Sequence, residues 1–324
     1  MTLSIIIVNY RSWSFLEDCL AGLLSDPQAG DWQIIVVDNH SSDGELENFS
    51  RRFDRVSFIA NSRNGGFAFG CNTGAGIASG QRLLFLNPDV MVRPGEVPAL
   101  LAAADRHPDV AILTATQVNA KDQVQKAWDV FPKLLTYFKS VKSVMRKLVP
   151  AYYPDPRAGQ KDLVYCDWVS GSILLIKRED FDDLGGWCED YWMYAEDCDL
   201  CYLAHARGLR VACTPDVRFV HLHGGASRQN REITVLTKCE AIISKHVFNN
   251  RHRTGIQRAL NHLFISLSAV PELMLWSVLN LLTLHRINAL TIRSSMLLRI
   301  LGHYLHVFRS GDWRSRQINR GCSE

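Results

Sequence analysis

The sequence predicts an α/β fold, with a mostly parallel sheet covered by helices on both faces and a helical region at the C-terminal end. Short apolar runs rich in β-branched residues alternate with segments of helical periodicity from residue 3 to about residue 230. Beyond residue 255 the strand pattern stops and long apolar or amphipathic segments follow. We therefore expect a sheet-containing domain over residues 1–240 and a basic amphipathic helical region over residues 241–324.

The first half of the chain supplies the clearest strands. Residues 3–10 (LSIIIVNY) form a continuous apolar run, which is typical of a strand buried on both faces. Residues 13–25 carry apolar side chains at helical spacing, and residues 32–44 hold a second buried strand that leads directly into an acid and a turn. Further strands are expected at 56–60 and 83–86, with a Gly- and Ala-rich helix from about Ala68 between them.

The pattern continues less regularly after residue 95. We expect a helix within 96–107, a strand at 110–118, two strand-like pieces within 163–179, a loop and a helix over 190–210 that ends at Gly208, and a strand, a turn, a second strand and a Gly-rich loop over 211–227. Residues 126–162 are aromatic, basic and interrupted by prolines, so we expect a mobile insertion or a loop beside a substrate.

Charge is distributed unevenly along the 324 residues. The net charge of +3 is too small to indicate a nucleic-acid partner. However, residues 245–320 contain eleven Lys or Arg residues and only two acids. This region is also strongly apolar, which favours a membrane surface over nucleic acid as its partner.

The segment 263–284 is mostly apolar over about 22 residues, long enough to cross a bilayer. Pro271 and Glu272 lie in its middle, and a carboxylate near the bilayer centre is costly. We therefore expect two half-length helices lying in the membrane interface; a packed helical subdomain and a true span remain alternatives. The first residues lack the basic and small-residue features of a signal peptide, so we expect them to form the first strand.

Nine cysteines, an odd number, suit a reducing compartment better than a disulfide framework. Cys198 and Cys201 form a C-x-x-C pair, for which zinc or redox chemistry is one interpretation. No second pair follows at zinc spacing, and the pair lies in a helical pattern. Buried small apolar side chains are therefore the favoured interpretation.

Polar residues gather where the expected strands end or the following loops begin. Each has a structural explanation as a helix cap, turn residue or first-turn acid. Taken together they would lie at the edge of a parallel sheet where ligands bind. The set comprises Asp38 with Asn39, Asp89, Glu196 with Asp197, and His221 with His223.

Several motifs occur in the order seen in one enzyme family: SIIIVNY, IIVVDNHSSDG, NGGFAFGCNTG, LFLNPDV, WVSGSILLIKRE, GGWCEDYWMYAEDCDLC and VHLHGGAS. Over residues 3–230 the chain thereby resembles the family-2 inverting glycosyltransferases of the GT-A fold, a Rossmann-like architecture. The Asn-Pro-Asp and MYAEDCDLC forms resemble the rhamnosyltransferase branch, which builds bacterial cell-surface polysaccharide. The C-terminal 90 residues carry no comparable motif.

The resemblance implies roles for individual residues. Asp197, adjoined by Glu196, would be the catalytic base, and Asp89 with His221 would hold Mg²⁺ or Mn²⁺. The nucleotide-sugar donor would be bound by Asn9, Asp38, Asn39, Asn64, Gly65, Gly66, Asn87, Trp168, Gly171 and Ser172. One departure matters, because Asn87 stands where the family often has a first metal-binding acid. A single carboxylate with a diphosphate can still hold Mg²⁺, and His221 would favour Mn²⁺.

The expected reaction is transfer of a sugar, foremost L-rhamnose from dTDP-rhamnose, to a hydroxyl of a lipid-linked or oligosaccharide acceptor. It would take place at the cytoplasmic face of the inner membrane, with the protein attached peripherally. A UDP-sugar donor carrying N-acetylglucosamine, galactose or galactofuranose remains an alternative, as does a non-catalytic nucleotide-sugar-binding scaffold. A dinucleotide-dependent dehydrogenase is excluded, because no G-x-G-x-x-G follows the first strand.

Overall fold

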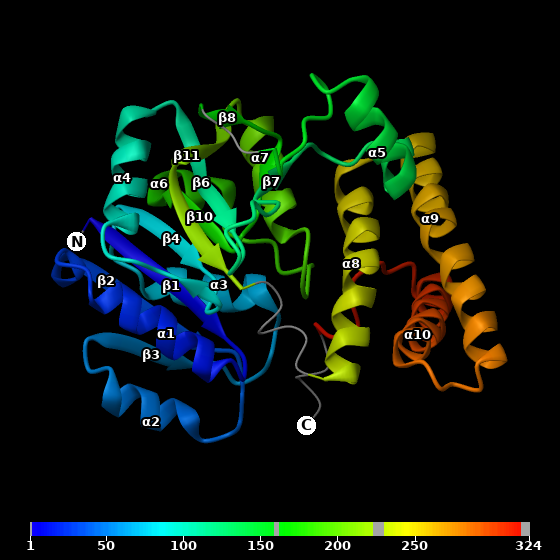
Figure 1. The fold of residues 1–324 in the computed structure, drawn as a ribbon, viewed down its shortest axis with the longest axis horizontal. Helices are drawn as coiled ribbons and strands as arrows, with labels where there is room; N and C mark the ends of the chain where they lie inside the picture. Colours follow the sequence, from blue (N-terminus) through cyan, green and yellow to red (C-terminus); the bar gives the residue numbers. More distant parts are fainter. Residues whose placement is uncertain (1, 159–161, 223–229, 319–324) are drawn as a thin grey trace.

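The computed structural model describes residues 2–158, 162–222 and 230–318. A sheet with helices on both faces forms one side of the molecule, and the C-terminal helices form a separate layer beside it (Figure 1). The strands are β1 (Leu3–Asn9), β2 (Trp32–Asp38), β3 (Val56–Ala60), β4 (Arg82–Leu86), β5 (Val90–Met91), β6 (Val110–Val118), β7 (Trp128–Asp129), β8 (Val164–Tyr165), β9 (Trp168–Val169), β10 (Ile173–Lys177) and β11 (Arg210–His221).

The main sheet has the order β3-β2-β1-β4-β10-β6-β11-β5, with β8 paired to β11. Strands β1 to β4 pair in parallel, as expected for βαβ units. Strand β10 runs antiparallel to both β4 and β6, so the second half of the sheet is mixed. Strands β7 and β9 form a separate two-stranded sheet.

Strand β11 replaces the strand, turn and second strand that we expected over 211–222. It runs continuously beside β6, but its register shifts between Thr214 and Arg218. Pro215 lies at that shift, where its missing N–H removes no regular ladder bond. The proline therefore marks a β-bulge inside one strand, and the strand continues to His221 at the edge of the site.

The helices of the sheet domain are α1 (Trp13–Leu24), α2 (Glu45–Arg52), α3 (Phe67–Ile77), α4 (Glu96–Arg106), α6 (Arg178–Leu184) and α7 (Glu196–Ala206), with a 3₁₀ turn at Ala29–Asp31. Strand β1 contributes Ile5 and Ile7 to a core shared with α1 and α4, and Ile6 to a core shared with α3, α6 and α7. The sheet is thus buried on both faces, as its continuous apolar strands predict.

Glycines let helix α3 approach the sheet closely. A Cβ atom on Gly70 would lie 2.6 Å from Val8, and one on Gly74 would lie 2.5 Å from Ile6. Larger residues at these positions would push α3 away from the strands whose ends form the site. The Gly- and Ala-rich composition of this helix is therefore a packing requirement.

The expected insertion at 126–162 contains secondary structure: β7, a 3₁₀ turn at Leu134–Tyr137 and helix α5 (Lys139–Leu148). Phe138, at the start of α5, packs edge-on against Phe264 of helix α9 with ring centroids 6.0 Å apart. This segment therefore bridges the sheet domain and the C-terminal layer, as Figure 1 shows.

Three long helices make up the C-terminal layer: α8 (Arg231–His252), α9 (Gly255–Leu282) and α10 (Asn288–Ser310). The expectation of two half-length helices at 263–284 was wrong, because α9 continues through Pro271. Ile265 before the proline and Leu273 after it are both buried, so packing holds both halves of the helix. This packing compensates for the backbone hydrogen bond that proline cannot donate.

The C-terminal layer is fixed to the sheet domain by a shared apolar cluster. Tyr191 and Cys198 from the region of α7 join Val247 of α8, Leu273 of α9 and Ile300 of α10. Cys198 and Cys201 are both buried in apolar clusters, which agrees with the packing interpretation of the C-x-x-C pair.

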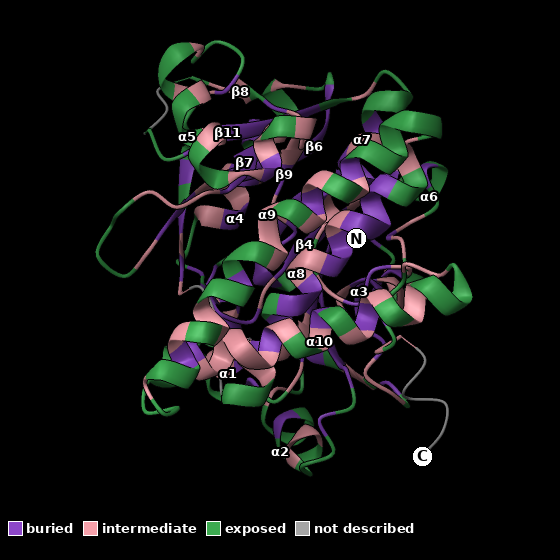
Figure 2. Ribbon diagram, turned by 90° about the vertical axis from the view of Figure 1, so that its right-hand side faces the viewer, coloured by how far each residue is buried: buried purple, intermediate pink, exposed green. Residues whose placement is uncertain are grey.

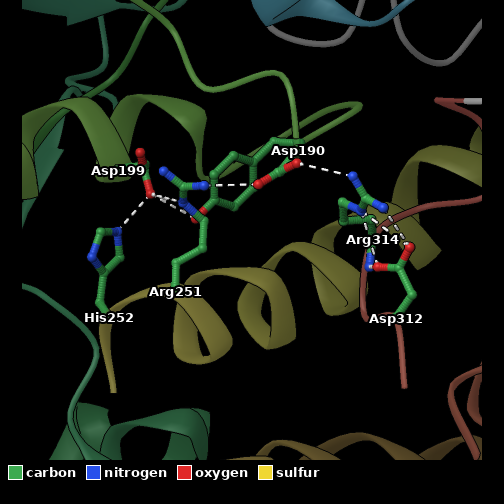
Figure 3. A network of polar contacts seen from close by, with 7 residues as sticks. Asp190, Asp199, Arg251, His252, Asp312 and Arg314 are labelled. Carbon is green, nitrogen blue, oxygen red and sulfur yellow. Dashed lines mark hydrogen bonds and ion pairs between the residues drawn. The ribbon is translucent and has the colours of Figure 1, made fainter. Parts of the chain in front are cut away.

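A polar network accompanies this cluster (Figure 3). The buried carboxylate of Asp199 accepts hydrogen bonds at Oδ1 from Arg251 Nε (3.1 Å), His252 Nε2 (2.5 Å) and the hydroxyl of Tyr191 (2.9 Å). Arg251 also pairs with Asp190 at 2.7 Å. Asp199 lies in the first turn of α7, so the network ties that helix to the end of α8.

Candidate active site

The sequence-selected polar residues gather at the carboxyl edge of the sheet. Asn9 and Asp38 end the paired strands β1 and β2 and lie side by side in register. Asp89 follows β4 through the turn at Asn87, and His221 ends β11 opposite Val90. A cavity of about 840 Å³ lies at the opposite edge of the sheet, and none of these residues lines it; Thr2, Arg82 and Lys177 are among its lining residues.

Asp38 and Asn39 are buried and engaged with their neighbours. Asp38 accepts hydrogen bonds from the Asn9 side chain (3.3 Å) and from the backbone N–H of Ser41 (3.0 Å), and the Ser41 hydroxyl also donates to it. Asn39 donates to Asn64 Oδ1 (3.1 Å) and to the carbonyl of Gly66 (2.8 Å). Asp38 and Asn39 therefore connect the end of β1, the loop after β2 and the loop at residues 61–66.

Asn61 was not selected from the sequence, although its side chain donates to Asn39 Oδ1 at 3.0 Å. It lies directly after β3, and an amide at a strand end is the signal that could have identified it. The neighbouring Asn64 is half-buried, and its side chain also accepts a hydrogen bond from the N–H of Gly66 at 3.1 Å.

Gly66 has a φ of +94°, and a Cβ atom there would lie 2.0 Å from the carbonyl oxygen of Trp192. The Trp192 carbonyl accepts a hydrogen bond from Phe67 N (3.1 Å), and its indole N–H donates to the carbonyl of Asn64 (3.3 Å). Glycine at this position thus permits close approach of the loop that precedes α7.

The side chains of Asp89 and His221 are in direct contact. His221 Nε2 lies 3.1 Å from Asp89 Oδ1, and both side chains are buried. The other ring nitrogen of His221, Nδ1, lies 2.8 Å from Gln117 Oε1, and Gln117 Nε2 in turn donates to the Ser172 hydroxyl at 2.9 Å. An amide oxygen accepts hydrogen bonds, so Gln117 favours the tautomer with a proton on Nδ1.

With the proton on Nδ1, Nε2 can offer its lone pair to a metal ion that Asp89 Oδ1, 3.1 Å away, also contacts. The donor set therefore fits a divalent metal with one imidazole and one carboxylate ligand. Within residues 2–158, 162–222 and 230–318, no group of three or more His, Cys, Asp and Glu could hold a metal. The remaining ligands would come from a diphosphate and water.

Gln117 is the functional candidate that the sequence pattern concealed. It lies inside the apolar run of β6 and is fully buried. An amide side chain in a strand whose other polar residues are threonines is the signal that could have indicated it, because a buried amide requires hydrogen-bond partners.

Glu196 and Asp197 open helix α7, as expected. The two residues before them, Tyr194 and Ala195, have φ values of +71° and +67°. Such left-handed backbone is unfavourable for non-glycine residues and is concentrated at functional sites. Asp197 accepts hydrogen bonds from the backbone N–H of Gly171 at Oδ2 (3.0 Å) and of Cys198 at Oδ1 (2.7 Å).

Burial raises the pKa of Asp197, although the N–H donors and the charge of Lys126 act in the opposite direction. Burial and the neighbouring Asp197 raise the pKa of Glu196 well above its usual range. Glu196 Oε2 is buried and has no hydrogen-bond partner in the described residues. The pair therefore provides one carboxylate oriented by backbone donors next to a carboxyl group that favours its neutral form.

The adjacent residues Gly171 and Ser172 connect Asp197 with the pair formed by Asp89 and His221. Ser172 contacts Gln117 on the Asp89 side, and Gly171 contacts Asp197 on the α7 side. The indole of Trp168 donates to the carbonyl of Val130 at 3.1 Å. His223 lies outside the described residues.

Comparison with known proteins identifies the family of the chain. The family model described as glycosyl transferase family 2 matches residues 4–168. Over 217 residues the chain is 28% identical to the N-acetylglucosaminyl-diphospho-decaprenol L-rhamnosyltransferase of Mycobacterium tuberculosis, covering 61% of this chain and 68% of the relative. Over 232 residues it is 24% identical to the rhamnosyltransferase WbbL of Escherichia coli, covering 67% and 82%.

Solved structures support the same fold. A mannosyltransferase from Pyrobaculum calidifontis, solved with GDP-Man and Mn²⁺, aligns with a TM-score of 0.52 at 15% identity, covering 92% of this chain and 86% of that one. GalNAc-T7, solved with UDP, GalNAc and Mn²⁺, gives a TM-score of 0.51 at 18% identity, covering 68% of this chain and 43% of that one. The chain has the GT-A fold and belongs to glycosyl transferase family 2, in its rhamnosyltransferase-like branch.

Proposed function

We propose that the protein is an inverting, metal-dependent glycosyltransferase that moves L-rhamnose from dTDP-rhamnose to a hydroxyl of a lipid-linked or growing cell-surface glycan. The observation that carries the proposal is the carboxylate of Asp197, held by the N–H groups of Gly171 and Cys198. Asp197 is connected to the pair of Asp89 and His221 through two adjacent residues. Gly171 binds Asp197, and Ser172 binds Gln117, which contacts His221. The rhamnosyltransferase relatives support the choice of sugar.

Asp197 would act as the general base. An acceptor hydroxyl has a pKa far above 7 and must lose its proton as its oxygen attacks the anomeric carbon. The raised pKa of Asp197 strengthens it as a base, while the two N–H donors orient its carboxylate. A single displacement by this oxygen inverts the anomeric configuration.

Asp89 and His221 would hold Mg²⁺ or Mn²⁺ against the donor diphosphate. When bound, the metal would offset the charge that builds on the diphosphate as it leaves. Gln117 would keep His221 in the ligand tautomer. Asn64 and the strand-end residues Asn9, Asp38 and Asn39 would shape the nucleotide end of the pocket.

The C-terminal layer would attach the protein to the cytoplasmic face of the membrane. By length and composition, α9 could cross a membrane, with a mean hydropathy of 1.5 over its best window, of which 17% is buried. Glu272 is exposed in its middle, which favours a surface position over a span. Figure 2 shows exposed and half-buried positions along α9 and α10, while the sheet strands are largely buried.

The exposed apolar residues of this layer include Met274, Leu275, Val278 and Leu282 on α9, and Leu298, Leu305 and Phe308 on α10. The double variant Leu275→Glu with Val278→Glu should lose binding to vesicles of anionic phospholipid in a sedimentation assay. These side chains are more than half exposed, so the fold should be kept. Undiminished sedimentation of the folded variant would refute the membrane role.

Donor binding by the purified full chain tests the proposed reaction. We expect dTDP-rhamnose to bind more tightly with Mn²⁺ or Mg²⁺ present, and Asp89→Asn to lose that enhancement. Tight binding of a UDP-sugar would instead replace the rhamnosyl assignment. Failure of every nucleotide sugar to bind would favour a non-catalytic scaffold.

A further inference from the structure

Five cationic side chains gather between the β7–β9 sheet, helix α5 and helix α8. Lys126 precedes β7; Lys142 and Arg146 lie on α5 with Lys139, and Lys245 lies on α8. Three of them contact the buried carboxylate of Asp129. Lys126 Nζ and Lys142 Nζ each lie 2.7 Å from its Oδ2, and Arg146 Nη2 lies 3.0 Å from its Oδ1.

The carboxylate of Asp129 neutralises only part of the charge of these five side chains, so the cluster keeps a large excess of positive charge. Lys245 and Lys139 make no hydrogen bond or ion pair with the described residues, and Arg146 Nε is buried without a partner there. Burial, followed by the charges of Lys139, Lys126 and Lys142, lowers the pKa of Lys245 to about 8. Placing cations together in a partly buried position is unfavourable unless an anion joins them.

The cluster adjoins the proposed catalytic base. Lys126 Nζ lies 4.7 Å from the centroid of the Trp168 ring, and its charge lowers the pKa of Asp197. On the side of the cluster away from Trp168, the start of α5 packs against α9 through the contact between Phe138 and Phe264. The cations therefore lie between Asp197 and the apolar helices of the C-terminal layer.

This position matches the order of groups in a lipid-linked sugar. Its hydroxyl would have to reach Asp197 and its hydrocarbon the apolar helices, so its phosphates would lie between them. We propose that Lys126, Lys142 and Lys245 bind the phosphate or diphosphate that joins the acceptor sugar to its lipid. The inference rests on the proposed function, because it takes Asp197 as the residue that receives the acceptor.

Equilibrium binding to the full chain, without donor, tests this site independently of transfer. Farnesyl diphosphate serves as the diphosphate probe and farnesol as its uncharged counterpart. Lys245→Met and Lys142→Met should each weaken farnesyl diphosphate binding about tenfold or more, because each removes a charge-assisted contact. Farnesol binding and dTDP-rhamnose binding should stay unchanged, as should all binding by the exposed control Lys121→Met.

The stability of Lys245→Met distinguishes an anion-binding role of Lys245 from a role in packing. Lys245→Met keeps the apolar stem and removes a half-buried charge that faces other cations, so its urea midpoint should equal or exceed that of the wild type. A lower midpoint with unchanged farnesyl diphosphate binding would assign Lys245 to packing and overturn the proposal.

The other outcomes separate alternative anions. Weakened dTDP-rhamnose binding with unaltered farnesyl diphosphate binding would assign the cluster to the donor and overturn the proposal. Weaker sedimentation with anionic vesicles, again with unaltered probe binding, would assign it to lipid headgroups. If farnesyl diphosphate binds as predicted but no sugar is transferred, the anion site stands and the proposed function fails.

Discussion

Asp199 should be the largest single electrostatic contributor to the junction between α7 and the C-terminal helices. Its side chain is 1% exposed and accepts from Tyr191, Arg251 and His252. Replacing it with alanine leaves three donors without their acceptor. A buried hydrogen bond to a charged group contributes about 1.5–3 kcal/mol, but Arg251 is a third exposed and keeps Asp190. We therefore expect Asp199→Ala to destabilise the protein by about 4 kcal/mol, within the range for breaking a buried ion pair.

Urea unfolding followed by tryptophan fluorescence measures this loss, using a common slope for all variants. Asp199→Asn keeps an acceptor oxygen and should lose about half as much. Asp312→Ala is the matched control, because Asp312 pairs with the half-exposed Arg314 at the surface of the same network, and it should lose less than about 1 kcal/mol. If Asp199→Ala were as stable as Asp312→Ala, the network in Figure 3 would not hold the layers together.

Three further predictions concern a buried acid, a glycine and a histidine partner. Burial raises the pKa of Glu240 from 4.5 to about 7, so the folded state binds more protons than the unfolded state between these pH values. The free energy of unfolding should therefore fall by about 3 kcal/mol as pH rises through this range. Glu240→Gln should remove this pH dependence from urea midpoints measured at pH 5 and pH 8, and an unchanged dependence would contradict the prediction. Gly66→Ala should lower stability by about 2–4 kcal/mol, because its Cβ would overlap the Trp192 carbonyl; a midpoint equal to wild type would exclude the clash. Gln117→Leu should weaken the Mn²⁺ enhancement of dTDP-rhamnose binding about tenfold or more through His221, and full enhancement would show that Gln117 does not orient this ligand.

The sheet domain was predictable because its signals are local. Continuous apolar runs identify β1, β2 and β4, and the polar residues at or just after their ends, Asn9, Asp38 and Asp89, identify the ligand edge. Helix α7 begins at Glu196, where the sequence placed it. The combination of strand-end acids with a parallel order thus leads directly to Asp38 and Asp89.

The parts that were not predictable depend on contacts between distant residues. The antiparallel placement of β10 follows from its pairing with β4 and β6, which no local pattern reveals. Pro271 and Pro215 were expected to end elements, but packing of the flanking residues carries α9 and β11 through them. Gln117 was not selected from the sequence, because its role depends on its contact with His221, which lies far from it along the chain.

The packing of the C-terminal layer on the sheet domain determines how its proposed role in membrane binding is best tested. Removal of residues 255–324 would uncover the apolar cluster around Tyr191 and Cys198, which packs on Leu273 and Ile300. A truncated chain would therefore confuse loss of membrane binding with loss of folding. Substitutions at exposed positions such as Leu275 avoid this problem.

The most direct test of the central claim is sugar transfer by the wild type and by Asp197→Asn, measured with Mn²⁺, dTDP-rhamnose and a lipid-linked sugar as the acceptor. Asparagine keeps the shape of the side chain but cannot take up the acceptor proton. We predict transfer by the wild type, and transfer slower by about 10²–10⁴ in the variant with the same dissociation constant for the donor. Transfer by Asp197→Asn at the wild-type rate would contradict the assignment of Asp197 as the base.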